Sequence, residues 1–428
     1  MVANSQGGIA EPQTEASNRH MMEQIETVVI GGGQAGLAMS YYLGQLGREH
    51  VILERDRAAE RWLSQRWDSL AFQSPNWNVR LPGLALSAAD PDAFASRDEV
   101  FGFIVGYADF IRAPLRCGVP VMSLRRTPDL KRLVVETPTG IFQAKNVVIA
   151  TGPFQTPLAP LSCGGNALNL HSSRYRNPQR LPPGAVLVIG SGNSGTQIAE
   201  ELCGAGRRVF LSVSRHRCIP RCYRGKDYTW WYLAFGDGDT TIEQQREEPP
   251  PRLLTGVGGG HDLNLRQLAA DGVVLLGRVL GGQDGRLTIA NDLGENLARG
   301  DASLVDFTRQ ADDYAALQGL ELPPREVRTK ILRTLKQVTD PILTLDIAAE
   351  SISTIIWANG FHYDFDWINL PIFANRTSSS GRAPVHRRGI TAISGAYFLG
   401  LPWLYKLKSA FLNGVGEDAE YLAERIAQ

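Results

Sequence analysis

Residues 25–54 read IETVVIGGGQAGLAMSYYLGQLGREHVILE, and this stretch decides the fold. Residues 26–30 form an apolar, β-branched run that is typical of a buried strand, and a glycine-rich turn leads from it into a helical pattern over residues 35–46. A second strand, His50–Leu53, ends at Glu54. A strand, a glycine turn, a helix and a strand that closes on an acid about 20 residues after the turn together predict a unit that binds a dinucleotide.

The three glycines of this turn follow G-x-G-x-x-G spacing, and each has its own task. Gly31 allows the tight turn, Gly33 lets the backbone approach a pyrophosphate, and Gly36 lets the helix pack closely on the strand. The helix N-terminus adds free N–H groups and the positive end of the helix dipole. Because Glu54 closes the second strand, its carboxylate can accept hydrogen bonds from both ribose hydroxyls, which favours a dinucleotide with a free ribose.

The same pattern occurs again in the middle of the chain. The apolar run Ala185–Ile189 precedes Gly190, Gly192 and Gly195 at the same spacing, and a predicted helix leads to a strand over residues 208–213. The repeat predicts a second dinucleotide-binding unit.

This second unit lacks the terminal acid, because its last strand runs into Ser214 and Arg215. A hydroxyl and a guanidinium favour a 2′-phosphate, which a carboxylate would repel. The alternative for Arg215 is a solvated surface charge. One site for a free ribose and one for a 2′-phosphate together predict FAD in the first unit and NADPH in the second.

Composition limits the other possibilities. The chain has 428 residues, too many for one core of ordinary size, and its 44 basic and 44 acidic residues balance, which argues against nucleic acid as a partner. No apolar run approaches the ~20 residues that span a bilayer. Residues 1–22 are polar and predict a disordered leader. The five scattered cysteines indicate a reducing, cytoplasmic setting, with no disulfide framework and no metal site.

The order of the units predicts a nested α/β architecture of two Rossmann-like domains, with the NADPH domain inserted into the FAD domain. We expect the first part of the FAD domain over residues 23–170. The NADPH domain follows over residues 171–340 and includes a substrate-region insertion, and residues 341–428 complete the FAD domain. The two sites then face each other across a cleft at the carboxyl ends of the strands.

Six motifs along the chain resemble the class B flavoprotein monooxygenases, namely the flavin-containing monooxygenases, the plant YUCCA enzymes of auxin synthesis and, more distantly, the Baeyer–Villiger monooxygenases. The motifs are GGGQAG, VIATGPF, LHSSRYRNP, VIGSGNSG, WANGFHYDF and GLPWLYKLKSAFLNGVGEDA, and they cover nearly the whole chain after residue 24.

The resemblance implies that NADPH reduces FAD, that O₂ adds to give a C4a-(hydro)peroxyflavin, and that one oxygen atom passes to a small organic substrate at nitrogen, sulfur or an activated carbon. The partners are then a small molecule and O₂, and the enzyme is a monomer or homodimer. Two alternatives stay open: a reductase or dehydrogenase that passes electrons to a quinone, disulfide or protein, and a non-catalytic flavoprotein that senses NADPH.

The resemblance also supplies two catalytic candidates. The family's asparagine near the reactive carbon of the flavin falls on Gln73, and the histidine of the family signature falls on His171. For His171 the alternative is a buried histidine that is satisfied by backbone groups. The basic group over residues 217–226 either holds an anionic substrate or serves the 2′-phosphate and solvent.

Trp62 and Trp67 either pack against the flat ring of a cofactor or are ordinary core aromatics. The strand over residues 144–150 ends in small residues, which let a dinucleotide pass close to the backbone. The glycine loops and the resemblance together give the expected cofactor-binding residues: Gly31, Gly33, Gln34, Ala35, Gly36, Glu54, Arg55, Trp62, Trp67, Gln73, Val121, Thr151, Gly152, Gly190, Gly192, Asn193, Ser194, Gly195, Ser214, Arg215, Asn359, Gly400 and Leu401.

Overall fold

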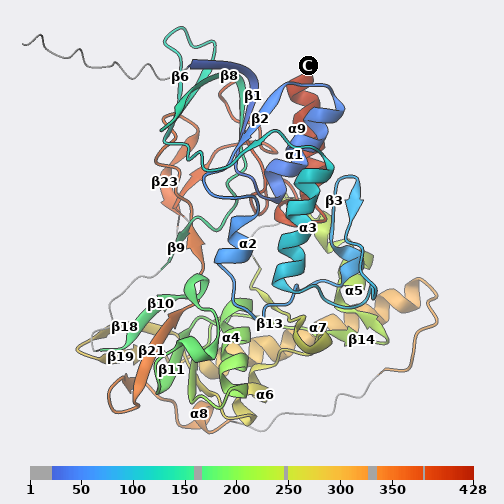
Figure 1. Cartoon of the computed structure of the whole chain (residues 1–428). Coiled ribbons are helices and arrows are strands. Elements are labelled where there is room, and N and C mark those ends of the chain that lie inside the picture. The colour runs from blue at the N-terminus through green and yellow to red at the C-terminus, as the bar shows by residue number, and fades with distance from the viewer. Residues whose placement is uncertain (1–21, 159–165, 245–248, 326–334, 379–380) are drawn as a thin grey trace, which may run out of the picture.

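The computed structural model of the chain describes residues 22–158, 166–244, 249–325, 335–378 and 381–428, and it contains two large sheets of mainly parallel strands (Figure 1). The predicted leader lies outside the described residues, apart from Met22, which begins the first strand. Figure 1 shows the first sheet in the upper half of the molecule and the second in the lower half. Within the described residues, no helix is both long enough and apolar enough to cross a bilayer.

The first sheet has the strand order β5-β2-β1-β8-β7-β6, and β25 also pairs with β8. Its strands are β1 (Met22–Ile30), β2 (His50–Leu53), β5 (Leu115–Arg116), β6 (Ser123–Arg126), β7 (Leu133–Thr137), β8 (Gly140–Ile149) and β25 (Ala396–Phe398). Only β7 runs against the direction of the other strands, so its pairings with β6 and β8 are antiparallel, and every other pairing in this sheet is parallel. The helices α1 (Gln34–Gln45), α3 (Arg97–Phe110) and α9 (Val415–Ala427) share one apolar core with this sheet (Figure 1).

The second sheet is parallel throughout, in the order β10-β21-β11-β12-β17. Its strands are β10 (Leu168–His171), β11 (Ala185–Ile189), β12 (Val209–Ser212), β17 (Val274–Leu276) and β21 (Ile352–Trp357). Separate apolar cores lie against it, and one of them includes α4 (Asn193–Gly204), α6 (Leu265–Ala270) and the start of α7 (Leu293–Leu317). Every residue of β11 is buried, which explains why its sequence is a continuous apolar run rather than an alternating one.

Because β25 returns from the end of the chain to pair with β8, the second sheet is inserted into the first unit. The predicted fold class, two Rossmann-like units with one nested in the other, is therefore confirmed. The residue limits of the two domains stay a prediction, with two corrections. We expected the first domain to run to residue 170, but β10 begins at Leu168 and belongs to the second sheet. We expected residues 341–428 to complete the first domain, but β21 pairs with β10 and β11 of the second sheet. A short buried strand has the same apolar pattern in either sheet, so its sequence does not reveal its partner.

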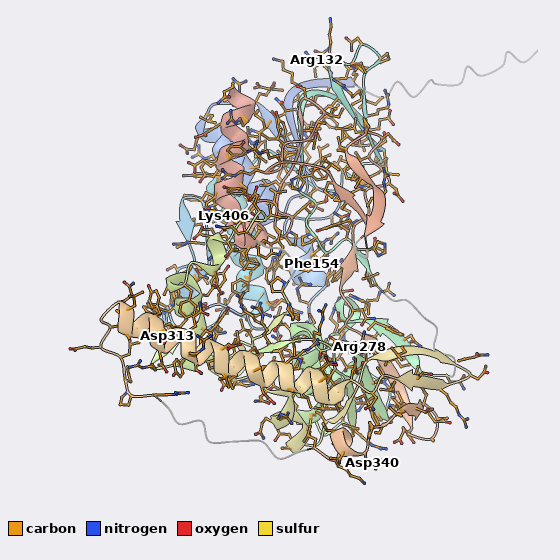
Figure 2. All side chains as sticks on the ribbon, turned by 180° about the vertical axis from the view of Figure 1, so that it is seen from behind. Arg132, Phe154, Arg278, Asp313, Asp340 and Lys406 are labelled. Carbon is orange, nitrogen blue, oxygen red and sulfur yellow. The ribbon has the colours of Figure 1, made fainter. Side chains whose placement is uncertain are left out.

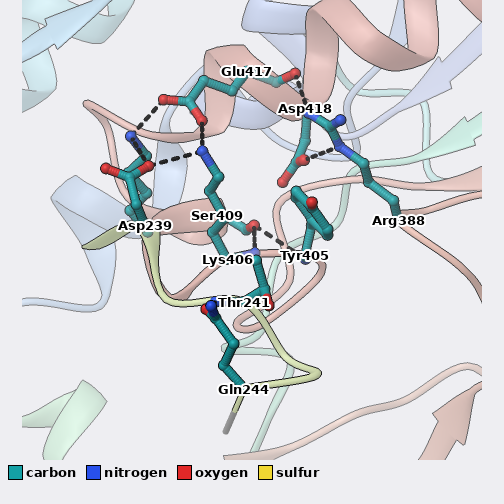
Figure 3. A network of polar contacts seen from close by, with 10 residues as sticks. Asp239, Thr241, Gln244, Arg388, Tyr405, Lys406, Ser409, Glu417 and Asp418 are labelled. Carbon is teal, nitrogen blue, oxygen red and sulfur yellow. Dashed lines mark hydrogen bonds and ion pairs between the residues drawn. The ribbon is translucent and has the colours of Figure 1, made fainter. Parts of the chain in front are cut away.

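A group of ion pairs ties the inserted part to the end of the chain (Figure 3). Lys406 contacts Asp239 and Glu417 at 2.8 Å each, and Lys408 contacts the same two carboxylates. Burial works to raise the pKa of both carboxyls, but the hydrogen bonds from the two lysines outweigh it and lower the pKa. Since exposed pairs contribute little singly but more as a connected network, these contacts help to hold the insertion against the first unit.

Both glycine turns bring a helix very close to the strand before it. A Cβ atom on Gly36 would lie 1.9 Å from the carbonyl oxygen of Gly31, and one on Gly195 would lie 1.8 Å from that of Gly190. Because the obstacle in each case is backbone, no rotamer change can relieve the clash. Gly44, later in α1, has no atom within 4 Å of an added Cβ.

We predict that Gly36→Ala lowers the free energy of unfolding by about 3 kcal/mol or prevents folding, because an overpacked site with no room to relax is costly. Gly44→Ala is the matched control in the same helix, and we expect it to stabilise the protein by about 0.5–1 kcal/mol. Urea or thermal unfolding of the purified variants measures both values. Equal stability of the two variants would contradict the packing described above.

Candidate functional site

The two glycine loops are built alike. Each lies at the carboxyl end of a parallel strand pair, β1 with β8 and β11 with β21. Gly31 and Gly190 have φ values of +114° and +106°, and a Cβ on either would lie 2.6 Å from the carbonyl oxygen of Ala150 or Ala358 respectively. The alanine in each case follows the neighbouring strand and donates its N–H back to the end of the glycine-loop strand, at 2.9 and 2.8 Å. The ends of two parallel strands therefore frame each loop, as in a nucleotide-binding switch point.

The middle glycines of the two loops face open space. A Cβ on Gly33 or Gly192 would meet no atom within 4 Å, and both residues have extended backbone. Each is the N-cap of its helix, α1 or α4, and neither helix has a side-chain cap. Uncapped helix N-termini beside an open glycine are the arrangement that accepts the phosphates of a dinucleotide. The residues present thus fit the two predicted cofactors.

One cavity of about 920 Å³ connects the two loops. Its wall includes these predicted residues: Gly31, Gly33, Gln34, Ala35, Glu54, Arg55, Trp62, Trp67, Gln73, Val121, Thr151, Gly152, Gly192, Asn193, Ser194 and Gly400. The wall does not include Gly36, His171, Gly190, Gly195, Ser214, Arg215, Asn359 or Leu401. Gly36, Gly190 and Gly195 pack against backbone on the side of the turns away from the cavity, which is why they are not in its wall.

Glu54 is held at the end of β2 by backbone groups. Its two carboxylate oxygens accept hydrogen bonds from the N–H groups of Gly32 at 2.6 Å and Asp56 at 3.0 Å. A carboxylate oxygen has room for further bonds, so Glu54 can still accept from a ribose. On the other side of the loop, the Gln34 amide donates to the carbonyl oxygen of Ala410 at 2.6 Å, which ties the first turn of α1 to the end of the chain.

The end of β12 lies beside the second loop, because the N–H of Ser214 donates to the Ser191 hydroxyl at 2.9 Å. The next residue, Arg215, is exposed and has no hydrogen-bond or ion-pair partner among the described residues. The side-chain oxygen of Asn359 also borders this loop, 3.2 Å from the position of a Cβ on Gly190. These positions agree with a 2′-phosphate site that extends from the loop toward the surface.

Gln73 lies between the two loops and contacts the second unit through both its side chain and its backbone. The Asn193 amide donates to the Gln73 side-chain oxygen at 3.3 Å, and the Arg221 guanidinium donates to the Gln73 carbonyl oxygen at 2.7 Å. Asn193 in turn accepts from the N–H of Leu254 at 2.8 Å. Gln73 is therefore placed to touch groups bound at either loop.

His171 is buried and uses both of its ring nitrogens. Nδ1 accepts the N–H of Ser173 at 3.1 Å, so the proton is on Nε2, which donates to the carbonyl oxygen of Gly360 at 3.0 Å. The ring also meets that of Phe361 edge-on, with centroids 4.8 Å apart. Burial lowers the pKa of His171, which keeps the ring neutral. These contacts favour the structural alternative, a histidine that anchors the segment after β21.

Arg61 and Arg66 also line the cavity, and sequence reasoning did not single them out. Burial lowers the pKa of each to about 10, and neither has a carboxylate partner within the described part of the chain. Arg66 lies 5.1 Å from the ring centroid of Phe154. Figure 2 shows Phe154 at the junction between the upper and lower halves of the molecule. The two arginines are five residues apart, on either side of most of α2 (Glu60–Ser64), and this spacing matches no sequence motif. Only the fold shows that both of these positive charges face the dinucleotide sites.

No described cysteine lines the cavity, and burial raises the pKa of Cys218 to about 12. Nor does the described part of the chain contain a cluster of three or more His, Cys, Asp or Glu side chains that could hold a metal ion.

Comparison with known proteins gives a consistent result. Residues 28–224 match the family described as pyridine nucleotide-disulphide oxidoreductase. An uncharacterized oxidoreductase of Geobacillus kaustophilus, named CzcO-like, is 33% identical over 412 residues, which are 95% of this chain and 99% of the relative. The indole-3-pyruvate monooxygenase YUCCA4 of rice is 28% identical over 205 residues, 44% of this chain and 46% of the plant enzyme. Among solved structures, a flavin-containing monooxygenase from Stenotrophomonas maltophilia has the same fold, with a TM-score of 0.63 and 20% identity over 95% of this chain and 98% of that one.

We predict that Gly33→Val and Gly192→Val fold normally but each lose one cofactor. Both backbones are extended and both Cβ positions are open, so the added side chain obstructs only a ligand. Gly33→Val should retain less than about a tenth of the wild-type flavin, and Gly192→Val should keep its flavin but bind NADPH about tenfold more weakly or worse, which is about 1.4 kcal/mol. Flavin absorbance and NADPH titration measure the two effects. Normal loading of both variants would contradict the assignment of the loops.

Proposed function

Because the chain belongs to the CzcO-like family of oxidoreductases, we propose that it is an NADPH-dependent FAD monooxygenase that places one oxygen atom of O₂ in a small organic molecule. The observation that carries this proposal is the single cavity that joins two dinucleotide cradles of opposite charge preference. A nicotinamide and a flavin bound at the two cradles can share this cavity, as hydride transfer between them requires.

Each cofactor is bound by its own set of residues. The loop of residues 31–33 and the N-terminus of α1 bind the FAD pyrophosphate, and Glu54 accepts from its ribose. The loop of residues 190–192 and the N-terminus of α4 bind NADPH, with Ser214 and Arg215 at its 2′-phosphate.

When bound, the flavin supplies the electrons that activate O₂ for transfer to the substrate. Around it, the Gln73 amide holds a hydrogen bond at the meeting point of the two cradles. Trp62, Phe72 and Phe154 contribute apolar wall, which excludes water from this part of the cavity. Arg66 adds a positive charge beside the ring of Phe154.

The absence of a cysteine from the described cavity wall supports oxygen over an internal thiol relay as the electron acceptor. A quinone, an external disulfide or a protein remains the alternative acceptor. We also infer that the enzyme works in a reducing cytoplasm, as a monomer or a homodimer.

We predict that NADPH consumption under ¹⁸O₂ yields a substrate that carries the heavy oxygen. The test supplies amines, sulfides, indoles, ketones and aromatic acids in turn and detects the added oxygen by mass spectrometry. Formation of stoichiometric hydrogen peroxide with every substrate, or efficient reduction of a quinone without labelled product, would show that the protein is a reductase and not a monooxygenase.

We predict that Arg215→Ala raises the KM for NADPH about tenfold or more and leaves the KM for NADH nearly unchanged, because a charge-assisted bond to the 2′-phosphate is lost. Arg299→Ala is the control, since Arg299 is another exposed arginine, on α7, and among the described residues it pairs only with Glu295 of the same helix. Steady-state kinetics with both nucleotides measure the effect. An equal change for NADPH and NADH would remove the 2′-phosphate assignment.

A further inference from the structure

The basic group that follows the second cradle separates into paired and unpaired side chains. Arg221 forms two hydrogen bonds with the Asp227 carboxylate, at 2.7 and 2.6 Å. Arg224 forms an ion pair with Asp312 at 3.3 Å. Arg217 has no carboxylate partner among the described residues, and it lies in the wall of the large cavity. The group is therefore not a uniform solvated surface.

Arg217 is held in place at one end and open at the other. It begins β13 (Arg217–Cys218), which pairs with β16 (Arg252–Leu253), and its Nε donates to the carbonyl oxygen of Pro250 at 2.9 Å. Its two terminal nitrogens make no hydrogen bond to the described residues and are not sealed from open space. The side chain is thus oriented by its Nε bond while the rest of the guanidinium fork remains available to a ligand.

The charges around Arg217 do not balance. Its neighbour Arg252 is neutralised by Asp237, whose carboxylate accepts a hydrogen bond from it at 2.6 Å. Burial, followed by the Arg252 charge, lowers the pKa of Arg217 to about 10, so Arg217 stays protonated at neutral pH. One positive charge is left without a partner. Since a half-buried unpaired charge is costly, an anionic group bound here would be stabilised strongly.

Two buried tyrosines lie in the same wall. Tyr228 and Tyr232 both line the cavity and are 5% and 6% exposed, and neither hydroxyl has a hydrogen-bond partner among the described residues. The Arg252 guanidinium lies 5.9 and 5.6 Å from the two ring centroids. Burial raises the pKa of Tyr228 to about 12, so its hydroxyl remains neutral. Both hydroxyl oxygens are shut off from the open part of the cavity, so these side chains contribute ring surface rather than hydrogen-bond donors to the wall.

The remaining wall at this end is apolar. Residues 249–251 are prolines, and Leu254 and Leu407 lie in the same wall. A ligand that fits this part of the cavity therefore has an apolar body and one acidic end.

We propose that Arg217 binds the carboxylate of an organic acid substrate whose apolar part lies against the prolines and leucines. This assignment rests on the proposed function and names its substrate class. The planar fork of a guanidinium matches a carboxylate in two parallel hydrogen bonds. The single excess charge matches a monoanion better than a doubly charged phosphate. Arg215 is exposed and does not line this cavity, so it remains available to the 2′-phosphate.

Calorimetric titration of the oxidised, FAD-loaded enzyme with NADP⁺ present tests the proposal. The probes are benzoate and hexanoate, each compared with its neutral amide, benzamide or hexanamide. The wild type should bind each acid about tenfold or more tightly than its amide, as expected for charge-assisted bonds. Arg217→Met should abolish this preference, and Arg217→Lys should retain part of it.

Arg215→Met is the matched control, because it removes another unpaired guanidinium two residues away. Arg215→Met should leave the affinity for benzoate unchanged and raise the KM for NADPH. Arg217→Met should weaken benzoate binding and leave the KM for NADPH unchanged. Flavin content and thermal unfolding establish that each variant is folded. Equal binding of acid and amide by the wild type, or binding of neither, overturns the subsite, as does an Arg217→Met variant that keeps the preference or loses NADPH instead.

This titration uses no oxygen and no turnover, so its outcome is separate from that of the ¹⁸O₂ experiment. Acid binding that depends on Arg217, without labelled product, would leave the subsite in place and overturn only the monooxygenase. Labelled product from neutral substrates alone, without acid binding, would leave the monooxygenase in place and overturn only the subsite.

Discussion

The rest of the structure depends on the missing side chains of Gly36 and Gly195. At both positions a helix lies so close to its preceding strand that a Cβ would come within 1.9 or 1.8 Å of a carbonyl oxygen. This contact fixes the direction of each helix, and so aims its uncapped N-terminus at the carboxyl edge of the sheet. Phosphate binding therefore follows from packing that the fold already needs, and the geometry exists before a ligand arrives.

Sequence reasoning could predict this much because the requirement is local. Glycine spacing, the strands around it, Glu54 after one strand and Ser214 after the other all lie within about 30 residues of each loop, as the dinucleotide motif demands. The structure has both loops where they were expected and brings most of the predicted residues into one cavity. The nested order was also predicted, from the order of the units along the chain, and the pairing of β25 with β8 confirms it.

What the sequence could not reveal depends on partners far along the chain. Arg224 is neutralised by Asp312, and the Gln73 carbonyl accepts from Arg221, contacts that no local pattern encodes. For the same reason a run of basic residues looks the same in the sequence whether or not its members are paired. Only the fold shows that Arg217 has no carboxylate partner in the described part of the chain. The sheet to which β21 belongs was missed on similar grounds, since a buried strand carries no sign of its neighbours.

The two cradles share one steric frame but differ in charge, and the insertion adds a third environment to the same cavity. The short 3-10 helix Asp237–Asp239 connects these features. Asp237 neutralises Arg252, Gly238 leaves room for the Tyr232 hydroxyl, and Asp239 is held by the lysines of the C-terminal segment (Figure 3). The wall that carries the excess positive charge is thus fastened to the unit that holds the first glycine loop. A cavity assembled in this way keeps its charge pattern only while the inserted unit and the end of the chain stay in contact.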